Sequence, residues 1–123
     1  MSTGHILWQD LTVPDAAPLR DFYSKVVGWT SEDVDMGGYA DYSMNDAEGN
    51  TVAGVCHARG TNSQVPPQWL IYIEVASVAE ATERALAEGG KVVDGPRAMG
   101  EGQFAVIQDP AGAVFAIIET PEE

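Results

Sequence analysis

The sequence predicts an α+β fold built from two consecutive βαβββ units. The turn Asp109-Pro110-Ala111-Gly112 repeats, 63 positions later, the plan of Asp46-Ala47-Glu48-Gly49, and each turn leads into an apolar stretch. Each half of the chain also has the hydrophobic pattern of a strand, a helix and three further strands. Matching turns at equivalent places in the two halves of a 123-residue chain indicate an internal repeat.

The first half has a clear helix between strands. Asp15 is a candidate N-cap, and Gly28 is a candidate C-terminal stop. Apolar residues between them follow the spacing of one helix face: Leu19, Phe22, Tyr23, Val26 and Val27. The strands expected in this half cover residues 4–13, 29–36, 39–44 and 51–57.

The second half repeats this order at an offset of 62, so that Trp8 matches Leu70 and Asp15 matches Ser77. Ser77 and Glu80 form a capping-box pattern that opens a helix, which Gly89-Gly90 ends. The strands expected here cover residues 69–76, 91–94, 103–108 and 113–119. We therefore expect one domain over residues 1–123, with units at 1–58 and 68–123, a polar connector at 59–67 and a frayed tail after residue 120.

Composition limits the function classes. Six basic and nineteen acidic side chains give a net charge of −13, which repels phosphate backbones and argues against nucleic acid as a partner. The charge either attracts a cationic ligand or only aids solubility. No apolar run approaches the length of about 20 residues that a membrane span needs. A single cysteine, Cys56, and the absence of a secretory pattern favour a cytoplasmic location.

Several short motifs carry a resemblance to a known family. They are Trp8-Gln9-Asp10-Leu11, Phe22-Tyr23, Gly28-Trp29, Gly89-Gly90-Lys91-Val92, Gly95-Pro96 and Asp109-Pro110-Ala111-Gly112. With the doubled βαβββ pattern, they resemble the vicinal oxygen chelate superfamily of glyoxalase I, bleomycin-resistance proteins and extradiol dioxygenases, and its small glyoxalase-like members above all. The resemblance implies two curled half-sheets around a cleft, and a homodimer.

The resemblance also implies where a metal would bind. Metal enzymes of this superfamily take ligands from four strand positions, which correspond here to Trp8, Ala53, Leu70 and Ala116. None of these side chains can donate a lone pair to a metal ion. We therefore expect neither a metal site nor another cofactor.

The first strand carries the first group of candidate ligand-binding residues. Alternation places Trp8, Asp10 and Thr12 on the cleft side. Together they form an aromatic wall beside a carboxylate, suited to a planar or cationic ligand. Alternatively, Trp8 only fills the space that a metal would leave.

The fifth strand carries the second group. Tyr72 and Glu74 are expected on the cleft side, opposite the core-facing Ile71, Ile73 and Val75. Glu74 in so apolar a strand could act as a general base, or it could be a solvated carboxylate at a strand end.

A histidine and the single cysteine are the remaining candidates for chemistry. His57 shares its side of the strand with Ala53 and Val55, which we expect to face the cleft. It is a candidate ligand-binding residue and acid–base group, or else an exposed side chain at a strand end. Cys56 is expected on the helix side as a buried, inert thiol.

These residues lead to three functional hypotheses. The first is a metal-independent small-molecule protein that binds, and could transform, an aromatic or polyketide-like compound, with Glu74 and Asp10 as catalytic groups. The second is a non-enzymatic, drug-sequestering protein of the bleomycin-resistance type. The third, a metal-dependent lyase or dioxygenase, conflicts with the missing ligands.

Overall fold

The computed structural model describes residues 3–59 and 64–119, which form two helices and eight strands. The chain divides into two compact units, one of residues 9–69 and the other of residues 1–8 together with 70–123. The fold is therefore α+β, as the sequence predicts. Neither helix in these described ranges is long and apolar enough to span a bilayer.

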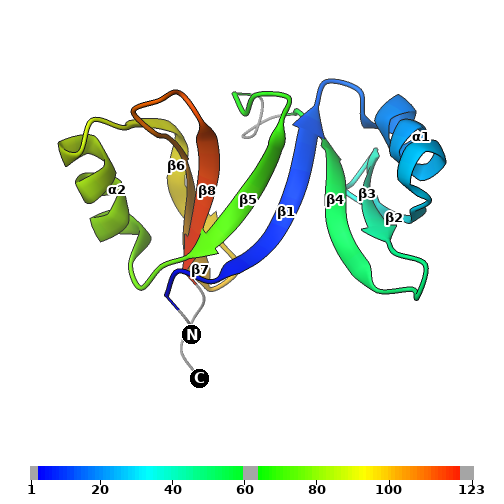
Figure 1. Ribbon diagram of the computed structural model, residues 1–123, viewed down its shortest axis with the longest axis horizontal. Coiled ribbons are helices and arrows are strands. Elements are labelled where there is room, and N and C mark those ends of the chain that lie inside the picture. The colour runs from blue at the N-terminus through cyan, green and yellow to red at the C-terminus, as the bar shows by residue number, and fades with distance from the viewer. Residues whose placement is uncertain (1–2, 60–63, 120–123) are drawn as a thin grey trace. The chain divides into compact units, whose positions relative to one another are not determined.

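The unit of residues 9–69 contains one helix and nearly all of one group of strands (Figure 1). Within this group the strand order is β2-β3-β4-β1, with β1 and β4 parallel and the other neighbours antiparallel. The elements are β1 (Ile6–Val13), α1 (Ala16–Val27), β2 (Thr30–Asp35), β3 (Ala40–Asn45) and β4 (Thr51–His57).

The other unit repeats this topology with the strand order β5-β8-β7-β6, and β5 and β8 are the parallel pair. Its elements are β5 (Trp69–Glu74), α2 (Val78–Ala87), β6 (Lys91–Met99), β7 (Gly102–Gln108) and β8 (Val114–Glu119). The residues before β1 join it because Glu74 N–H donates to the His5 carbonyl at 2.8 Å and Gly4 N–H donates to the Glu74 carbonyl at 2.7 Å.

The two Asp-x-x-Gly turns are built alike. In each, the Asp carboxylate accepts the backbone N–H groups two and four positions later, and the Asp carbonyl accepts that of the glycine, whose φ is positive. These bonds measure 2.9, 2.9 and 3.0 Å in the turn at Asp46, and 2.8, 3.0 and 3.0 Å in the turn at Asp109. The internal repeat predicted from these turns is therefore confirmed.

After the turn, the first repeat has one residue more than the second. In β4, Thr51 pairs with Asn45 and Ala53 pairs with Met44, so Val52 is a bulge without a partner in that register. The Gln9 side-chain amide donates to the Val52 carbonyl and so satisfies the bulged backbone. The corresponding pairs of β7 and β8 are continuous. The bulge explains why the two turns are 63 positions apart, whereas Gly54 of β4 and its counterpart Ala116 of β8 are 62 positions apart.

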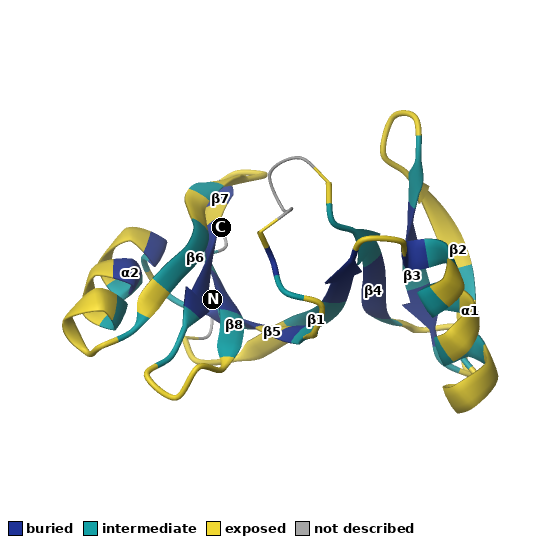
Figure 2. Ribbon diagram, turned by 90° about the horizontal axis from the view of Figure 1, so that it is seen from above, coloured by how far each residue is buried: buried dark blue, intermediate teal, exposed yellow. Residues whose placement is uncertain are grey.

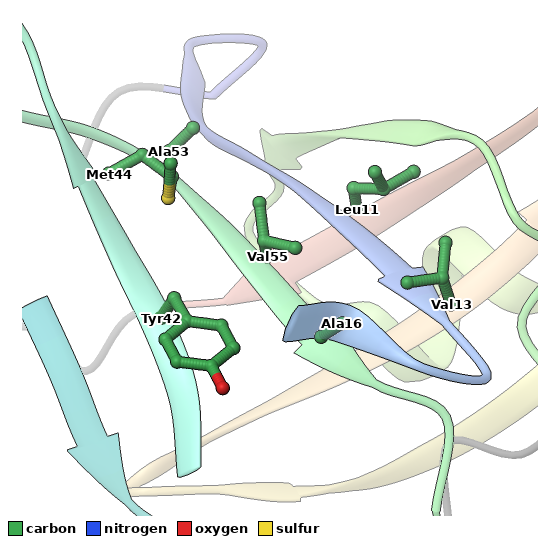
Figure 3. Close-up of a cluster of buried hydrophobic side chains, with 7 residues drawn as sticks. All are labelled: Leu11, Val13, Ala16, Tyr42, Met44, Ala53 and Val55. Carbon is green, nitrogen blue, oxygen red and sulfur yellow. The ribbon is translucent and has the colours of Figure 1, made fainter. Parts of the chain in front are cut away.

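Each helix covers one face of its own strands. Beneath α1, seven buried side chains from β1, β3, β4 and the first turn of α1 form the core drawn in Figure 3: Leu11, Val13, Ala16, Tyr42, Met44, Ala53 and Val55. The core beneath α2 contains Val78, Ala105, Ile107 and Ile117. The outer surfaces of both helices are exposed (Figure 2). We call the opposite side of each group of strands, against which no helix packs, the helix-free face.

Several local predictions need correction. Of the predicted α1 stripe, Leu19 and Tyr23 pack against the core, whereas Phe22, Val26 and Val27 are each more than half exposed. Asp15 occupies the N-cap position without a side-chain capping bond, while Ser77 does accept the Glu80 N–H at 3.2 Å. The strand expected at 91–94 continues to Met99, with irregular register around Gly95-Pro96. The expected tail and most of the connector lie outside the described residues.

The matched turns provide a test of the repeat. Replacing Asp46 or Asp109 with Ala removes two carboxylate hydrogen bonds, so we expect each variant to lose about 1–2 kcal/mol of unfolding free energy in urea titrations. The matched Asn variants retain an acceptor oxygen and should lose less. Equal losses for Asn and Ala would show that these side-chain bonds do not stabilise the turns.

Candidate functional site

Polar side chains surround an apolar floor on the helix-free face of the unit that contains β5–β8. Cross-strand pairing aligns two rows of residues over four strands. The first row is Tyr72, Ala116, Val106 and Asp94, and the second row is Glu74, Ile118, Phe104 and Arg97. Because residues aligned across a sheet share a face, these eight side chains form one continuous surface. We call it the β5–β8 face.

Tyr72 and Glu74 come together on this face, and both are buried, with exposed fractions of 9% and 4%. The alternative that Glu74 is a solvated carboxylate is therefore wrong. Ile71, which was expected to face the core, is 39% exposed, while Ile73 is half-buried and Val75 packs against the α2 core. Alternation thus gave the face of each β5 residue but not its burial.

Asp94 and Arg97 complete the β5–β8 face, and the sequence analysis missed both. The Arg97 guanidinium donates to Asp94 Oδ1 and lies 4.3 Å from the centre of the Phe104 ring. Asp94 Oδ2 is buried and has no hydrogen-bond partner in the described structure. Such orphaned buried oxygens are uncommon and concentrate at functional sites or beside ordered water. The signal available in the sequence was the opposite charges three residues apart, across a segment interpreted as a turn.

The helix-free face of the other unit is more polar. Asp10 pairs with Gly54 and Thr12 pairs with Cys56, while Leu11 and Val13 point into the α1 core. Asp10 is half-buried and Thr12 is buried. Cys56 was expected on the helix side, and this prediction is wrong. Burial, with the negative charges of Asp10 and Asp41, raises the pKa of the Cys56 thiol.

His57 lies on the helix side of β4, together with Ala53 and Val55, rather than on the helix-free side predicted for all three. It is not an exposed residue at a strand end, since its side chain is only 16% exposed. Asp41, a buried residue that the sequence analysis missed, accepts the His57 backbone N–H at 2.8 Å and lies 3.3 Å from His57 Nδ1. Asp15 Oδ1 lies 3.7 Å from His57 Nε2. The imidazole is thus held between two carboxylates.

The candidate residues divide between the two units. Trp8, which is half-buried, belongs with Tyr72 and Glu74, whereas Asp10, Thr12 and His57 belong to the unit of residues 9–69.

The pairing register also corrects one of the four positions at which a metal ligand was considered. Because Asp10 pairs with Gly54 and Tyr72 pairs with Ala116, the counterpart of Ala116 is Gly54, and Ala53 lies in the α1 core. Neither glycine nor alanine has a ligating side chain, and Trp8 and Leu70 are equally unsuitable. Among residues 3–59 and 64–119, no group of three His, Cys, Asp or Glu side chains is placed to hold a metal ion. The donor set therefore does not fit the metal that the resemblance implies.

Comparison with known proteins identifies the family. Residues 3–117 match the model of the Glyoxalase/Bleomycin resistance protein/Dioxygenase superfamily. The chain belongs to this superfamily. Solved structures share the fold at low identity: methylmalonyl-CoA epimerase of Streptomyces coelicolor aligns with a TM-score of 0.53 and 15% identity over 98% of this chain and all of its own. The hypothetical protein BH1468 of Bacillus halodurans aligns with a TM-score of 0.56, at 15% identity over 99% and 98% of the two chains.

Curated relatives are more similar in sequence. The anthracycline biosynthesis protein DnrV of Streptomyces peucetius is 35% identical over 93% of this chain and 46% of its own length. The putative glyoxylase CFP32 of Mycobacterium bovis is 30% identical over 95% of this chain and 44% of its own length. The chain thus spans about half the length of the curated relatives it matches.

The environment of Cys56 predicts slow thiol chemistry. Because the raised pKa lowers the thiolate fraction at a given pH, we expect modification by a disulfide reagent at pH 8 to be at least about tenfold slower in the folded protein than in urea. Asp41→Asn removes one of the negative charges and should accelerate the folded-state reaction. Asp33→Asn, at an exposed position on β2, is the matched control. An unchanged rate in Asp41→Asn would contradict this assignment.

Proposed function

We propose that the β5–β8 face binds an aromatic, polyketide-class small molecule without a metal ion. The observation that carries this proposal is the pair of aligned rows, which places Glu74, Tyr72, Asp94 and Arg97 around the buried apolar floor. Small-molecule sites typically combine an apolar lining with a few convergent polar groups. This set of residues has that composition.

Each group has a distinct role in the proposal. Phe104, with the Arg97 guanidinium against its ring, offers an aromatic surface for a planar ligand. The Tyr72 hydroxyl supplies a hydrogen bond to a ligand oxygen. Glu74 is the proposed proton acceptor, which takes a proton from an acidic hydroxyl or C–H group and returns it to another atom of the ligand, so that an isomer forms. Asp10 and Thr12, in the unit of residues 9–69, form a second proposed set, in which Asp10 is the alternative catalytic carboxylate. Trp8 belongs to the unit of the β5–β8 face and is proposed as an aromatic ligand contact there. His57 is left out because it lies on the helix side of its strand.

The relatives support the chemical class of the ligand. DnrV is described as an anthracycline biosynthesis protein, and it is 35% identical to this chain. Anthracyclines are planar aromatic polyketides, which suit the apolar floor. Because the chain spans about half of that relative, the activity of the whole relative is not transferred here. Pairing of two copies of the chain, and a cytoplasmic location, stay predictions.

A second candidate function is sequestration without turnover. The net charge of −13 favours it, because an acidic protein attracts a planar ligand that carries a cationic group. The two functions share a binding event and differ in whether a product forms.

The catalytic part of the proposal rests on Glu74. We expect incubation with an anthracycline aglycone to give an isomeric product that liquid chromatography resolves, and Glu74→Gln to lower the rate at least about 100-fold while the aglycone still binds. Glu83→Gln, at an exposed position on α2, is the matched control and should leave the rate unchanged. Full activity in Glu74→Gln would exclude Glu74 as the proton acceptor, and Asp10→Asn would be tested next.

Salt dependence separates the two functions. Sequestration predicts that an amino-sugar glycoside of the aglycone binds more tightly than the neutral aglycone, and that this preference falls several-fold between low and 0.5 M salt because exposed charges are screened. Calorimetric titrations of both ligands measure the effect. Equal, salt-independent affinities would show that the acidic charge only aids solubility.

A further inference from the structure

A cavity lies on the α2 side of the unit that contains β5–β8, away from the β5–β8 face. Its volume is about 160 Å³, and it lies between the end of α2, the strands β7 and β8, and the turn that joins them. The apolar part of its lining comes from Ala85, Gly90, Ile107, Pro110 and Phe115. All five belong to the unit of residues 1–8 and 70–123, so the cavity is contained in one compact unit.

The internal repeat shows what occupies the equivalent place in the other unit. Both helices begin at an offset of 62, from Ala16 to Val78, so Ala85 is the counterpart of Tyr23. Gly90 is the counterpart of Trp29 by strand pairing. Trp29 precedes Thr30, which pairs with Asn45 just before the turn, and Gly90 precedes Lys91, which pairs with Gln108 just before the other turn. The two residues that leave the cavity open therefore correspond to two aromatic residues.

Those aromatic residues are packed against one another. The rings of Tyr23 and Trp29 stack at 6.0 Å with an interplanar angle of 29°, and the Trp69 ring meets Tyr23 edge-on at 5.2 Å. The Trp69 indole N–H donates to the Tyr23 hydroxyl at 2.9 Å. Where the first repeat packs a phenol ring against its core, the second has a methyl group and a cavity. Gly90 cannot fill it, because a Cβ there would lie 2.9 Å from the Gln108 carbonyl oxygen.

A polar cavity of about 240 Å³ adjoins the apolar one, and both are lined by Gln108, Asp109 and Pro110. Lys91 also lines the polar cavity. A ligand that spans the two would place a ring against Phe115 and Ile107, and a hydrogen-bonding substituent toward Gln108 and Lys91. A dry apolar cavity of about 150 Å³ is large enough to bind benzene.

We propose that this cavity is a second small-molecule site, which takes a single aromatic ring carrying a hydroxyl group, that is, a phenol. The site is separate from the β5–β8 face and does not depend on the function proposed there. The first repeat supplies the ring from its own chain at Tyr23, and the second repeat takes it from solution.

The probe for this site is p-cresol, which has the structure of a tyrosine side chain. We expect it to bind saturably with a Kd of about 1 mM or tighter, and to shift the backbone amide NMR signals of Ala85, Gly90, Ile107 and Phe115. Ala85→Tyr should fill the cavity, weaken p-cresol binding at least tenfold and raise the thermal midpoint. Ala85→Met is a second, more adaptable filling variant in case the tyrosine does not fit.

The matched control is Ala79→Tyr, which adds the same ring at an exposed position of α2 and should leave p-cresol binding unchanged. If p-cresol causes no saturable shifts at these four amides up to 10 mM, the cavity is only a packing defect and the proposal is overturned. Shifts that persist unchanged in Ala85→Met would overturn it equally. Neither result would affect Glu74 or the β5–β8 face.

Discussion

The structure depends on the parallel pairing of the first and last strands of each repeat, β1 with β4 and β5 with β8. A parallel pair needs a long crossover between its strands, and here a helix and two further strands form that crossover. The helix packs against one face of its strands, so the candidate polar groups and their apolar floor lie on the other face. The apolar cores, the β5–β8 face and the apolar cavity beside α2 all depend on which face of the strands each side chain occupies.

The sequence predicted the elements that local chemistry determines. The two Asp-x-x-Gly turns and the Ser77 cap appear as expected, because each is made of hydrogen bonds within a few residues. The faces of Ala53, Cys56 and His57 were wrong for one common reason: counting from the turn assumed a continuous strand, and the bulge at Val52 inserts one residue. Strand side chains alternate, so one extra residue exchanges the two faces.

Other features could not be predicted because they depend on contacts between distant strands. The burial of Glu74 and the exposure of Ile71 are set by what covers each face, which alternation does not report. Asp94 and Arg97 reach the β5–β8 face only through the irregular register of β6 with β7. Asp41 has the sequence pattern of an ordinary strand residue, and its role depends on a hydrogen bond from the His57 backbone N–H, sixteen positions along the chain.

The bulge at Val52 also bears on how a duplicated domain diverges. A substitution changes one side chain. The gain or loss of one residue beside a turn would exchange the two faces of the whole strand that follows, so that its core residues would lie on the helix-free face and its site residues in the core. In the first repeat the bulge, with Gln9 bonded to the Val52 carbonyl, confines the extra residue to one position. The two repeats therefore keep the same spacing of 44 positions, from Asp10 to Gly54 and from Tyr72 to Ala116, although the turn comes one position later in the second repeat.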